Sequence, residues 1–413
     1  MEVVLLTAAA MRVLIFNAGS SSLKCRLFEL PPGEPPAEPP AALWAGHAGW
    51  TQRAGKAELR IRTAAGATTE NCITIDSPEA VFEPLLASLP RGDIDAAGHR
   101  IVHGGKLFRV STLMNPEVKA AIGQQSELAP EHNRIELHAI EAAARILGPE
   151  IPQIAVFDTG FHATLPEAAY IYPGPYSWLE QGIRRYGFHG ISHQYASRRA
   201  AELAGRPLNS LRLITCHLGN GCSLAAVRNG SSVDTTMGFT PLEGLMMGGR
   251  SGSVDPGILI HLLKHGGYDA RKLDHVLNEE SGLQGVSGVS SDMREVLEAR
   301  AIGNPRASLA FDIYVHRVRS GIGAMLASLG GLDALAFTAG VGENSPEVRD
   351  AVCSAFAFLG VVVDPRVNCE GAGDRDIAPA AAKVRVLVIA AQEEWEIARE
   401  CRRLLTAPAE SAI

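Results

Sequence analysis

The 413-residue sequence lacks a basic excess and a long apolar run, and each absence excludes a class of protein. Lys and Arg number 38 against 45 Asp and Glu, so the net charge is −7 and the pI is near 6.0. Nucleic-acid binding needs a basic face, so we expect no nucleic-acid partner. No uninterrupted apolar stretch approaches the roughly 20 residues that span a bilayer, so we expect no membrane segment.

The sequence also lacks paired cysteine motifs. Its cysteines number seven, and no Cys-x-x-Cys occurs. Disulfide frameworks use even numbers and zinc sites use closely spaced pairs, so the pattern indicates free thiols in a reducing, cytoplasmic compartment. Residues 1–10 are apolar but have no basic start, so we expect no signal peptide. Because Met11 and Arg12 directly precede the first predicted strand, these ten residues read as an extension.

A Walker A motif is missing as well, because neither Gly55-Lys56 nor Gly105-Lys106 is followed by Ser or Thr. This excludes a P-loop kinase. The sequence has a different candidate for phosphate binding, the stretch 17–24, which reads Asn-Ala-Gly-Ser-Ser-Ser-Leu-Lys. Apolar runs on both sides predict two strands and a tight turn. Small side chains, hydroxyls and one Lys suit an anion such as phosphate, although this stretch alone equally fits an ordinary Ser-rich hairpin.

A second copy of this pattern favours the phosphate interpretation. The apolar run 213–216 leads into His-Leu-Gly-Asn-Gly-Cys-Ser at 217–223, and a second apolar run follows at 224–227. The two copies lie about half a chain apart, and internal similarity of this kind indicates duplicated units. We therefore predict two related domains that hold a nucleotide between them, and the length of the chain also favours two domains.

The coarse element pattern predicts a mixed α/β protein. Residues 31–40 are Pro-rich and predict a surface loop, because proline cannot donate to a sheet. We expect one or two strands in 44–75 and no regular element in the Gly-rich segment 237–257. Asp158 follows a buried strand at 151–157, the end of a strand where ligands bind in α/β sheets. The remaining elements are strands at 95–102, 333–338 and 384–390, and helices at 130–147, 195–203, 258–265, 307–329 and 394–405.

Eight motifs, in order, resemble those of the acetate kinase family, which belongs to the actin and sugar-kinase superfamily. The resemblance extends from about Met11 to Arg403. The motifs are Asn17–Lys24, Gly98–Gly105, Phe157–His162, Arg185–Gly190, His217–Gly221, Gly248–Gly252, Gly288–Arg294 and Gly340–Asn344.

The resemblance implies an α/β fold of two duplicated ribonuclease H-like (actin-like ATPase) domains with a nucleotide cleft between them. The N-terminal domain would comprise 11–160 and 393–413, and the nucleotide and dimer domain 161–392. The implied reaction is reversible phosphorylation of a short-chain carboxylate, acetate, by ATP to give acyl phosphate and ADP. The resemblance also implies Mg²⁺, with Mn²⁺ as an alternative, a homodimer, and closure of the two lobes around the substrates.

Phosphoryl transfer to a carboxylate brings several negative charges together, so its catalysis is mostly positioning and charge neutralisation. Arg100 and Arg250 lie in Gly-rich surroundings, and a guanidinium suits both a carboxylate and a phosphoryl group. The resemblance places Arg100 near the carboxylate and Arg250 near the transferred group. It makes His189 a donor to the phosphoryl oxygens. It makes Asp158 a residue that orients the substrates, with action on the carboxyl proton as a second role.

Other site residues rest on the resemblance alone. Val102, Phe188 and Pro241 would line the acyl pocket. The metal ligands would be Asn17 and Glu393, although this chain reads Ala391-Gln-Glu-Glu394 where the family usually has Thr-Asn-Glu-Glu. Nucleotide-binding residues would be Ser22, Lys24, His217, Leu218, Gly219, Asn220, Gly221, Asp292, Met293, Arg294, Gly340, Val341, Gly342, Glu343 and Asn344.

One departure from the family concerns acyl selectivity. This chain reads Ala129-Pro-Glu-His-Asn-Arg134 where the family commonly has Leu in place of Glu131. An unpaired carboxylate beside an apolar methyl group is costly. Either Glu131 turns outward, with Arg134 as a partner, or the acyl selectivity differs from that for plain acetate.

Two alternatives remain open at this point. Propionate kinase has the same motifs, and a nucleotide-switch ATPase shares the superfamily. The two site arginines and His189 favour a kinase, because a switch does not need them.

Overall fold

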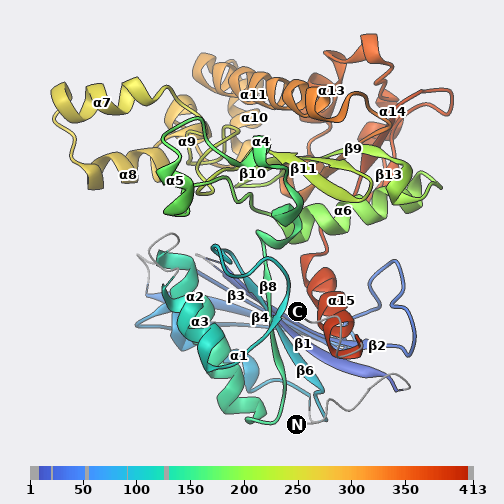
Figure 1. The fold of residues 1–413 in the computed structure, drawn as a ribbon. Coiled ribbons are helices and arrows are strands. Elements are labelled where there is room, and N and C mark those ends of the chain that lie inside the picture. The colour runs from blue at the N-terminus through green and yellow to red at the C-terminus, as the bar shows by residue number, and fades with distance from the viewer. Residues whose placement is uncertain (1–8, 20–21, 52–54, 91, 125–129, 408–413) are drawn as a thin grey trace. The chain divides into compact units, whose positions relative to one another are not determined.

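The computed structural model describes residues 9–19, 22–51, 55–90, 92–124 and 130–407 (Figure 1). The side chains of residues 51 and 130–134 are also outside this description. The expectations for residues 1–8, for the turn residues 20 and 21, and for the Glu131 and Arg134 side chains therefore lie outside the described residues. The chain divides into two compact units: unit 1 comprises Met1–Gly160 and Gln392–Ile413, and unit 2 comprises Phe161–Ala391.

Unit 1 is built on a mixed sheet of eight strands in the order β5-β4-β3-β2-β1-β6-β8-β7. The strands are β1 (Met11–Ala18), β2 (Ser22–Leu30), β3 (Trp44–Thr51), β4 (Lys56–Thr63), β5 (Thr68–Thr74), β6 (Ala96–Ile101), β7 (Thr112–Leu113) and β8 (Gln153–Phe157). Strands β1 to β5 pair antiparallel, and β6 and β8 continue the sheet parallel to β1.

The prediction of one or two strands in 44–75 was wrong, because this segment forms three. The third strand, β5, could not be recognised in the sequence, because all its side chains except that of Ile73 are exposed. A strand without a buried face has no apolar alternation to reveal it.

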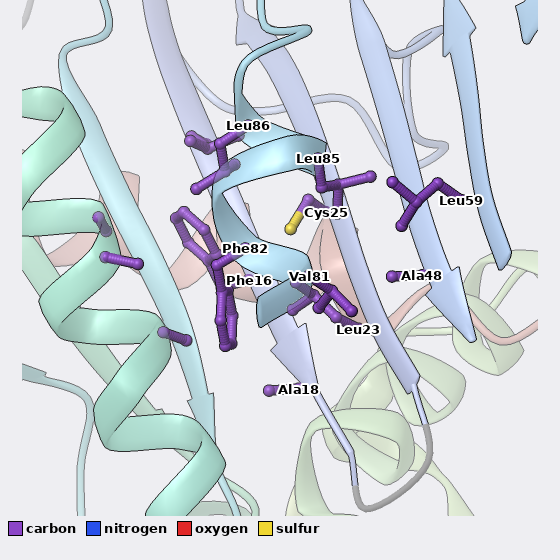
Figure 2. Packing of buried hydrophobic residues seen from close by; sticks show 14 of the residues in the cluster. Phe16, Ala18, Leu23, Cys25, Ala48, Leu59, Val81, Phe82, Leu85 and Leu86 are labelled. Carbon is purple, nitrogen blue, oxygen red and sulfur yellow. The ribbon is translucent and has the colours of Figure 1, made fainter. Parts of the chain in front are cut away.

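The helices of unit 1 cover both faces of its sheet. Figure 2 shows Phe16, Leu23 and Cys25 of the sheet packed against η1 (Pro78–Val81) and α1 (Phe82–Leu86), and α3 (Pro130–Leu147) joins the same buried cluster. On the other face, α15 (Glu393–Thr406) lies so close to β6 that a Cβ added at Gly98 would be 2.5 Å from the Cys401 sulfur. The remaining helix of this unit is α2 (Pro116–Gln124).

The Pro-rich segment 31–40 is a loop without regular structure, as predicted. Helix α15 holds it through two arginines. Arg399 Nη1 donates to the carbonyls of Pro35 and Pro36, each at 2.9 Å, and Arg402 Nη1 donates to the Pro31 carbonyl. Because proline carbonyls have no strand partner here, the two guanidiniums satisfy acceptors that a sheet would otherwise satisfy.

Unit 2 repeats the strand order of unit 1. Its six-stranded sheet runs β11-β10-β9-β12-β14-β13. The strands are β9 (Arg212–Leu218), β10 (Cys222–Arg228), β11 (Ser231–Thr235), β12 (Ala334–Thr338), β13 (Arg375–Asp376) and β14 (Arg385–Val388). An antiparallel hairpin, β9–β10, is followed by the parallel strands β12 and β14. The order β11-β10-β9-β12-β14 matches β3-β2-β1-β6-β8, which confirms the predicted duplication of a ribonuclease H-like α/β fold.

Two helices cover opposite faces of the second sheet. His193 of α6 (Gly190–Leu203) contacts Ser223 on β10, whereas Gly321 of α11 (Pro305–Leu329) approaches the next residue, Leu224. Neighbouring residues of a strand point to opposite faces, so the sheet lies between these helices.

The remaining helices surround this core, and α7 (Pro256–His265) and α8 (Ala270–Glu279) project from it as a pair (Figure 1). Shorter helices complete the chain: η3 (Gly160–Thr164), α4 (Glu167–Tyr170), α5 (Ser177–Glu180), η4 (Leu208–Ser210), α9 (Gly282–Ser287), α10 (Met293–Ala301), α12 (Ala339–Asn344), α13 (Pro346–Ser354), η5 (Ala357–Leu359) and α14 (Pro365–Cys369). Within the described ranges, no helix is both long and apolar enough to cross a membrane. All seven cysteines are described and none forms a disulfide, as predicted.

Candidate functional site

In unit 1 the candidate site lies at the carboxyl ends of β6 and β8. Arg100 is on β6, and Asp158 follows β8 directly, as the sequence predicts. The Arg100 guanidinium donates to Asp158 Oδ2 from Nη2 at 2.6 Å and from Nε at 3.1 Å. The carboxylate therefore holds the guanidinium in a fixed orientation.

Burial and charge shift the pKa values of Arg100 and Asp158 in opposite directions. Burial alone would lower the pKa of Arg100, but the charges of Asp158 and Glu393 outweigh it and raise that pKa, so Arg100 stays charged. Burial also raises the pKa of Asp158, and Arg100 opposes this shift. Asp158 Oδ1 is buried and has no hydrogen-bond partner in the described protein, so a second acceptor is available beside Arg100.

Asn17 meets two carboxylates at the start of α15. Its Nδ2 donates to Glu393 Oε2 at 3.1 Å and to Glu394 Oε1 at 2.9 Å. Asn17 is thus next to Glu393, the other predicted metal ligand. An amide oxygen and a carboxylate suit Mg²⁺, which takes few protein oxygens and completes its shell with water and phosphate. Among the described residues, no cluster of three or more His, Cys, Asp or Glu that could enclose a metal occurs.

The first predicted phosphate hairpin is formed by β1 and β2. The Gly19 N–H donates to the Ser22 carbonyl at 2.8 Å, which closes the turn. Lys24 is exposed on β2 and pairs in register with Asn17. Val102, a predicted acyl-pocket residue, is buried just after β6, where its N–H donates to Glu136 Oε1 at 3.1 Å.

In unit 2 the candidate site centres on His189, which precedes helix α6. His189 has φ 56° and ψ 25°, a left-handed conformation that is unfavourable for a residue with a Cβ. The preceding residue, Phe188, is buried, and its carbonyl oxygen contacts His162 Nε2 at 3.1 Å. The turn therefore directs the imidazole away from the helix and toward the tip of the β9–β10 hairpin.

His189 and Arg250 converge at Gly221 in this hairpin. A Cβ added at Gly221 would lie 3.2 Å from His189 Nε2 and 3.8 Å from Arg250 Nη1. Only a residue without a side chain leaves this space open. The structure thus brings two predicted catalytic groups to one point of the second phosphate hairpin.

A chain of hydrogen bonds supports His189 from behind. Ser223 Oγ lies 2.8 Å from His189 Nδ1 and 2.8 Å from His193 Nε2. His193 Nδ1 in turn lies 2.7 Å from Thr215 Oγ1. Burial lowers the pKa of His193 well below its usual value, so this ring is neutral. If the Thr215 hydroxyl donates to His193 Nδ1, then His193 Nε2 donates to Ser223 Oγ, and the Ser223 hydroxyl donates to His189 Nδ1. The proton of the His189 ring is then on Nε2, the atom next to Gly221.

Replacing Ser223 with Ala should test this support. The change removes the donor to His189 Nδ1, and the loss of one such hydrogen bond corresponds to about a tenfold decrease in kcat. KM should change little, because Ser223 is fully buried and exposes no surface to a substrate. Steady-state kinetics measure both constants, and Ser177→Ala, an exposed position of the same unit, is the matched control. A kcat equal to that of the control would show that the serine does not orient His189.

Arg250 belongs to the Gly-rich segment that the sequence predicts to be irregular. The segment turns back on itself, since the Met247 N–H donates to the Arg250 carbonyl at 3.1 Å. Arg250 Nη1 lies 3.4 Å from the carbonyl of Pro241, a predicted acyl-pocket residue. Burial lowers the pKa of Arg250, partly opposed by Glu279. A poorly solvated guanidinium of this kind interacts strongly with an incoming anion.

The sequence did not reveal the network that holds this segment. Arg185 Nη1 donates to the carbonyls of Thr235, Thr236 and Met237 at 3.0–3.1 Å, and its Nη2 donates to Glu243 Oε1 at 2.7 Å. Arg185 lies in a recognised motif, but its partners are about 50 residues away in sequence, so no local signal identifies them.

A pocket of about 870 Å³ lies beside the second hairpin. Several predicted nucleotide-binding residues line it, namely Gly219, Asn220, Asp292, Met293, Arg294, Gly340, Val341 and Asn344. The sequence missed its other lining residues, which are Leu283, Ser291, Leu297, Ser345, Pro346 and Glu347. Ser291 lies inside the motif Gly288–Arg294. The others are mostly apolar or small and belong to no motif, so only their position identifies them.

Seven predicted nucleotide residues are not part of this lining: Ser22 and Lys24 of unit 1, and His217, Leu218, Gly221, Gly342 and Glu343 of unit 2. His217 stacks on His189 with ring centroids 4.0 Å apart, and its Nδ1 contacts Ser192 Oγ at 2.7 Å. Glu343 Oε1 accepts from the Ala391 N–H at 2.9 Å. His217 and Glu343 therefore contact neighbouring residues of unit 2 and do not line the pocket.

The fold and these sites define a class of protein. Two ribonuclease H-like units, a cation and an imidazole at a Gly-rich hairpin, and a neighbouring pocket are the features of α/β phosphotransferases. Within this class, residues 12–399 match the model of the Acetokinase family. The chain belongs to this family.

Individual relatives agree with this assignment. An acetate kinase of Trichormus variabilis is 59% identical over 404 residues, which cover 96% of this chain and all of the relative. The crystal structure of Porphyromonas gingivalis acetate kinase superposes with a TM-score of 0.86 at 40% identity, covering 96% of this chain and 100% of that one. A propionate kinase structure from Francisella tularensis has a TM-score of 0.84 at 36% identity, covering 94% and 98%.

Proposed function

We propose that this chain is an acetate kinase, which reversibly transfers the γ-phosphoryl group of ATP to acetate and forms acetyl phosphate and ADP. The observation that supports this proposal most directly is the convergence of His189 Nε2 and Arg250 Nη1 at Gly221. Both groups can donate to phosphoryl oxygens, and the adjacent pocket has room for an adenosine. The similarity to acetate kinases over almost the whole chain supports the same substrate pair.

The proposed reaction requires little covalent chemistry from the protein itself. A carboxylate oxygen attacks the γ-phosphorus, the new C–O–P link forms, and the bond from the phosphorus to the bridging oxygen of ADP breaks. The carboxylate is already ionised at neutral pH, so no proton needs to be removed. Arg250 and His189 then stabilise the charge on the equatorial oxygens, while Arg100 orients the carboxylate and Asp158 keeps Arg100 in place.

We assign the remaining groups by the same reasoning. Ser22, Lys24 and the backbone of 217–221 would bind phosphates, and the residues of the 870 Å³ pocket would bind adenosine. Val102, Phe188 and Pro241 would contact the acyl methyl group. Asn17 and Glu393 would hold Mg²⁺, with Mn²⁺ as an alternative; when bound, the ion would neutralise charge on the ATP phosphates.

A hydroxylamine trap tests the function directly. The purified chain is incubated with ATP, Mg²⁺ and acetate, and hydroxylamine converts any acetyl phosphate into a coloured hydroxamate. Hydroxamate that requires both ATP and acetate supports the proposal. Hydrolysis of ATP without hydroxamate would instead indicate a nucleotide-switch ATPase and would overturn it.

A propionate kinase is the second candidate, because the Francisella tularensis propionate kinase has the same fold. Glu131, which stands where the family commonly has Leu, bears on the choice between acetate and propionate. We propose comparing turnover of acetate, propionate and butyrate by wild type and Glu131→Leu. A shift in the preference between the three acids would show that position 131 affects selectivity, whereas identical profiles would dismiss that role.

We also propose that the chain forms a homodimer through unit 2. Helix α7 buries none of its residues within its own unit. Ile258, Ile260 and Leu263 on this helix are 50%, 53% and 47% exposed. Large apolar side chains gathered on a projecting helix are typical of an interface, because burying them against a second copy removes apolar area from water.

Replacing Ile260 with Asp should convert such a dimer into a monomer. A buried, unpaired carboxylate is costly, so even one substitution at an interface core strongly weakens association. Size-exclusion chromatography with light scattering measures the mass. Val110→Asp in unit 1, at a position 64% exposed, is the matched control and should remain dimeric. A dimer in both variants would place the interface elsewhere.

A further inference from the structure

Unit 1 contains a buried acid to which the proposed reaction gives no role. Glu136 is on α3 and is 1% exposed. Its Oε1 accepts the N–H of Val102 at 3.1 Å, just beyond Arg100 in the chain. Its Oε2 is buried, and no donor or acceptor in the described part of the chain reaches it. The Glu136 carboxyl group thus fixes the backbone at Val102 with one oxygen, and its other oxygen makes no hydrogen bond to the described residues.

Among the residues whose side chains the structure describes, none contacts Glu136 with a positive charge that would neutralise an ionised carboxylate. The Arg100 guanidinium is held by Asp158 at 2.6 Å, so it acts on Glu136 only at longer range, and Asp158 acts with the opposite sign. The histidines on either side of this segment each have a partner of their own: His99 Nε2 contacts Gln153 Oε1, and His103 Nδ1 accepts from the Gly105 N–H. Ionising a carboxyl that is buried and without a contacting cation is unfavourable.

Protonation follows from this environment. Burial raises the pKa of Glu136 to about 8, although Arg100 and the Val102 N–H both act to lower it. The carboxyl is therefore uncharged through neutral pH, and it ionises only in the alkaline range.

We infer that Glu136 is a positioning residue for the carboxylate substrate. It fixes the Val102 backbone by accepting its N–H. While Oε2 carries a proton, Glu136 also adds no negative charge near the substrate beside Arg100. The inference rests on the proposed function, in which Arg100 and Val102 receive the carboxylate. It adds a residue that contacts the acyl-pocket backbone and not the substrate.

The sign of the pH effect follows. As the pH rises through about 8, Glu136 gains a negative charge that repels the substrate carboxylate. KM for acetate should then rise by about tenfold one pH unit above this pKa, because only the protonated fraction binds well. KM for ATP and kcat at saturating acetate should not follow the same curve.

Glu136→Gln is the decisive variant. The amide can still accept from the Val102 N–H, but it cannot ionise, so KM for acetate should no longer depend on the titration of this position. Glu136→Met, which also cannot ionise but loses the hydrogen bond, should give a higher KM that is equally flat with pH. Glu141→Gln, on the same helix with a side chain 58% exposed, is the matched control and should keep the wild-type profile.

Measuring KM for acetate from pH 6 to about 9.5 in these four proteins separates the outcomes. An alkaline rise in wild type and Glu141→Gln, absent from both Glu136 variants, supports the inference. A flat wild-type profile, or the same rise in Glu136→Gln, overturns it. If Glu136→Gln does not fold, Glu136→Met decides in the same way. Acetyl phosphate formation by wild type at neutral pH tests the proposed function separately, so the two failures are distinguishable.

Discussion

Replacing Arg250 with Ala is expected to lower kcat by about 10²–10³-fold, the range measured when one preorganised donor to a transition state is removed. Arg250 meets this description on three counts. Its Nη1 points to the open space at Gly221, where His189 Nε2 also lies. Its loop is fixed by backbone hydrogen bonds, and the side chain is half-buried, which lowers its pKa.

The effect should be on kcat more than on KM for ATP. The phosphoryl group reaches its in-line transfer geometry only in the transition state, so a donor fixed for that geometry contributes most to kcat. Initial rates at saturating ATP and acetate give kcat, and ATP titration gives KM. Arg228→Ala, at an exposed position of the same unit, is the control. Near-normal turnover of Arg250→Ala would refute the role of Arg250.

Replacing Arg349 with Ala should have the largest effect on stability. Arg349 is 1% exposed, and its guanidinium donates to both Asn368 oxygens at 2.7 Å and to the carbonyls of Gly342 and Glu343 at 2.9 and 2.8 Å. These two carbonyls belong to α12, the helix that contributes Gly340 and Val341 to the lining of the 870 Å³ pocket. The side chain thus joins α12 to α14.

We expect a loss of about 3–5 kcal/mol, because the truncation leaves a cavity and several buried acceptors without a donor. Denaturant titration measures the loss as a lower midpoint at an unchanged slope. ATP affinity should fall as well, since α12 loses its attachment. Arg366→Ala on α14 is the matched control: its guanidinium is 83% exposed and makes one surface ion pair, which contributes roughly 0–1 kcal/mol. Equal midpoints for the two variants would contradict the prediction.

Local patterns in the sequence were sufficient for several of the elements with a buried face, although not for α2, α10 or α13. The apolar runs around 17–24 and 217–223 predicted both hairpins, and the strand at 151–157 correctly placed Asp158 at its carboxyl end. The same reasoning failed for β5, whose exposed side chains give no alternation. The order of the motifs predicted the family, which the comparisons confirm.

The sequence by itself therefore determined the fold class, the duplication and the family, because each depends on residues close together in the chain. Only the tertiary structure decided what surrounds the functional groups. It places Ser223 and His193 behind His189, Glu136 against the Val102 N–H and Arg349 under α12. The reason is physical: the protonation, orientation and strength of a charged or polar group depend on burial and on partners contributed by distant segments, and residue identity encodes neither.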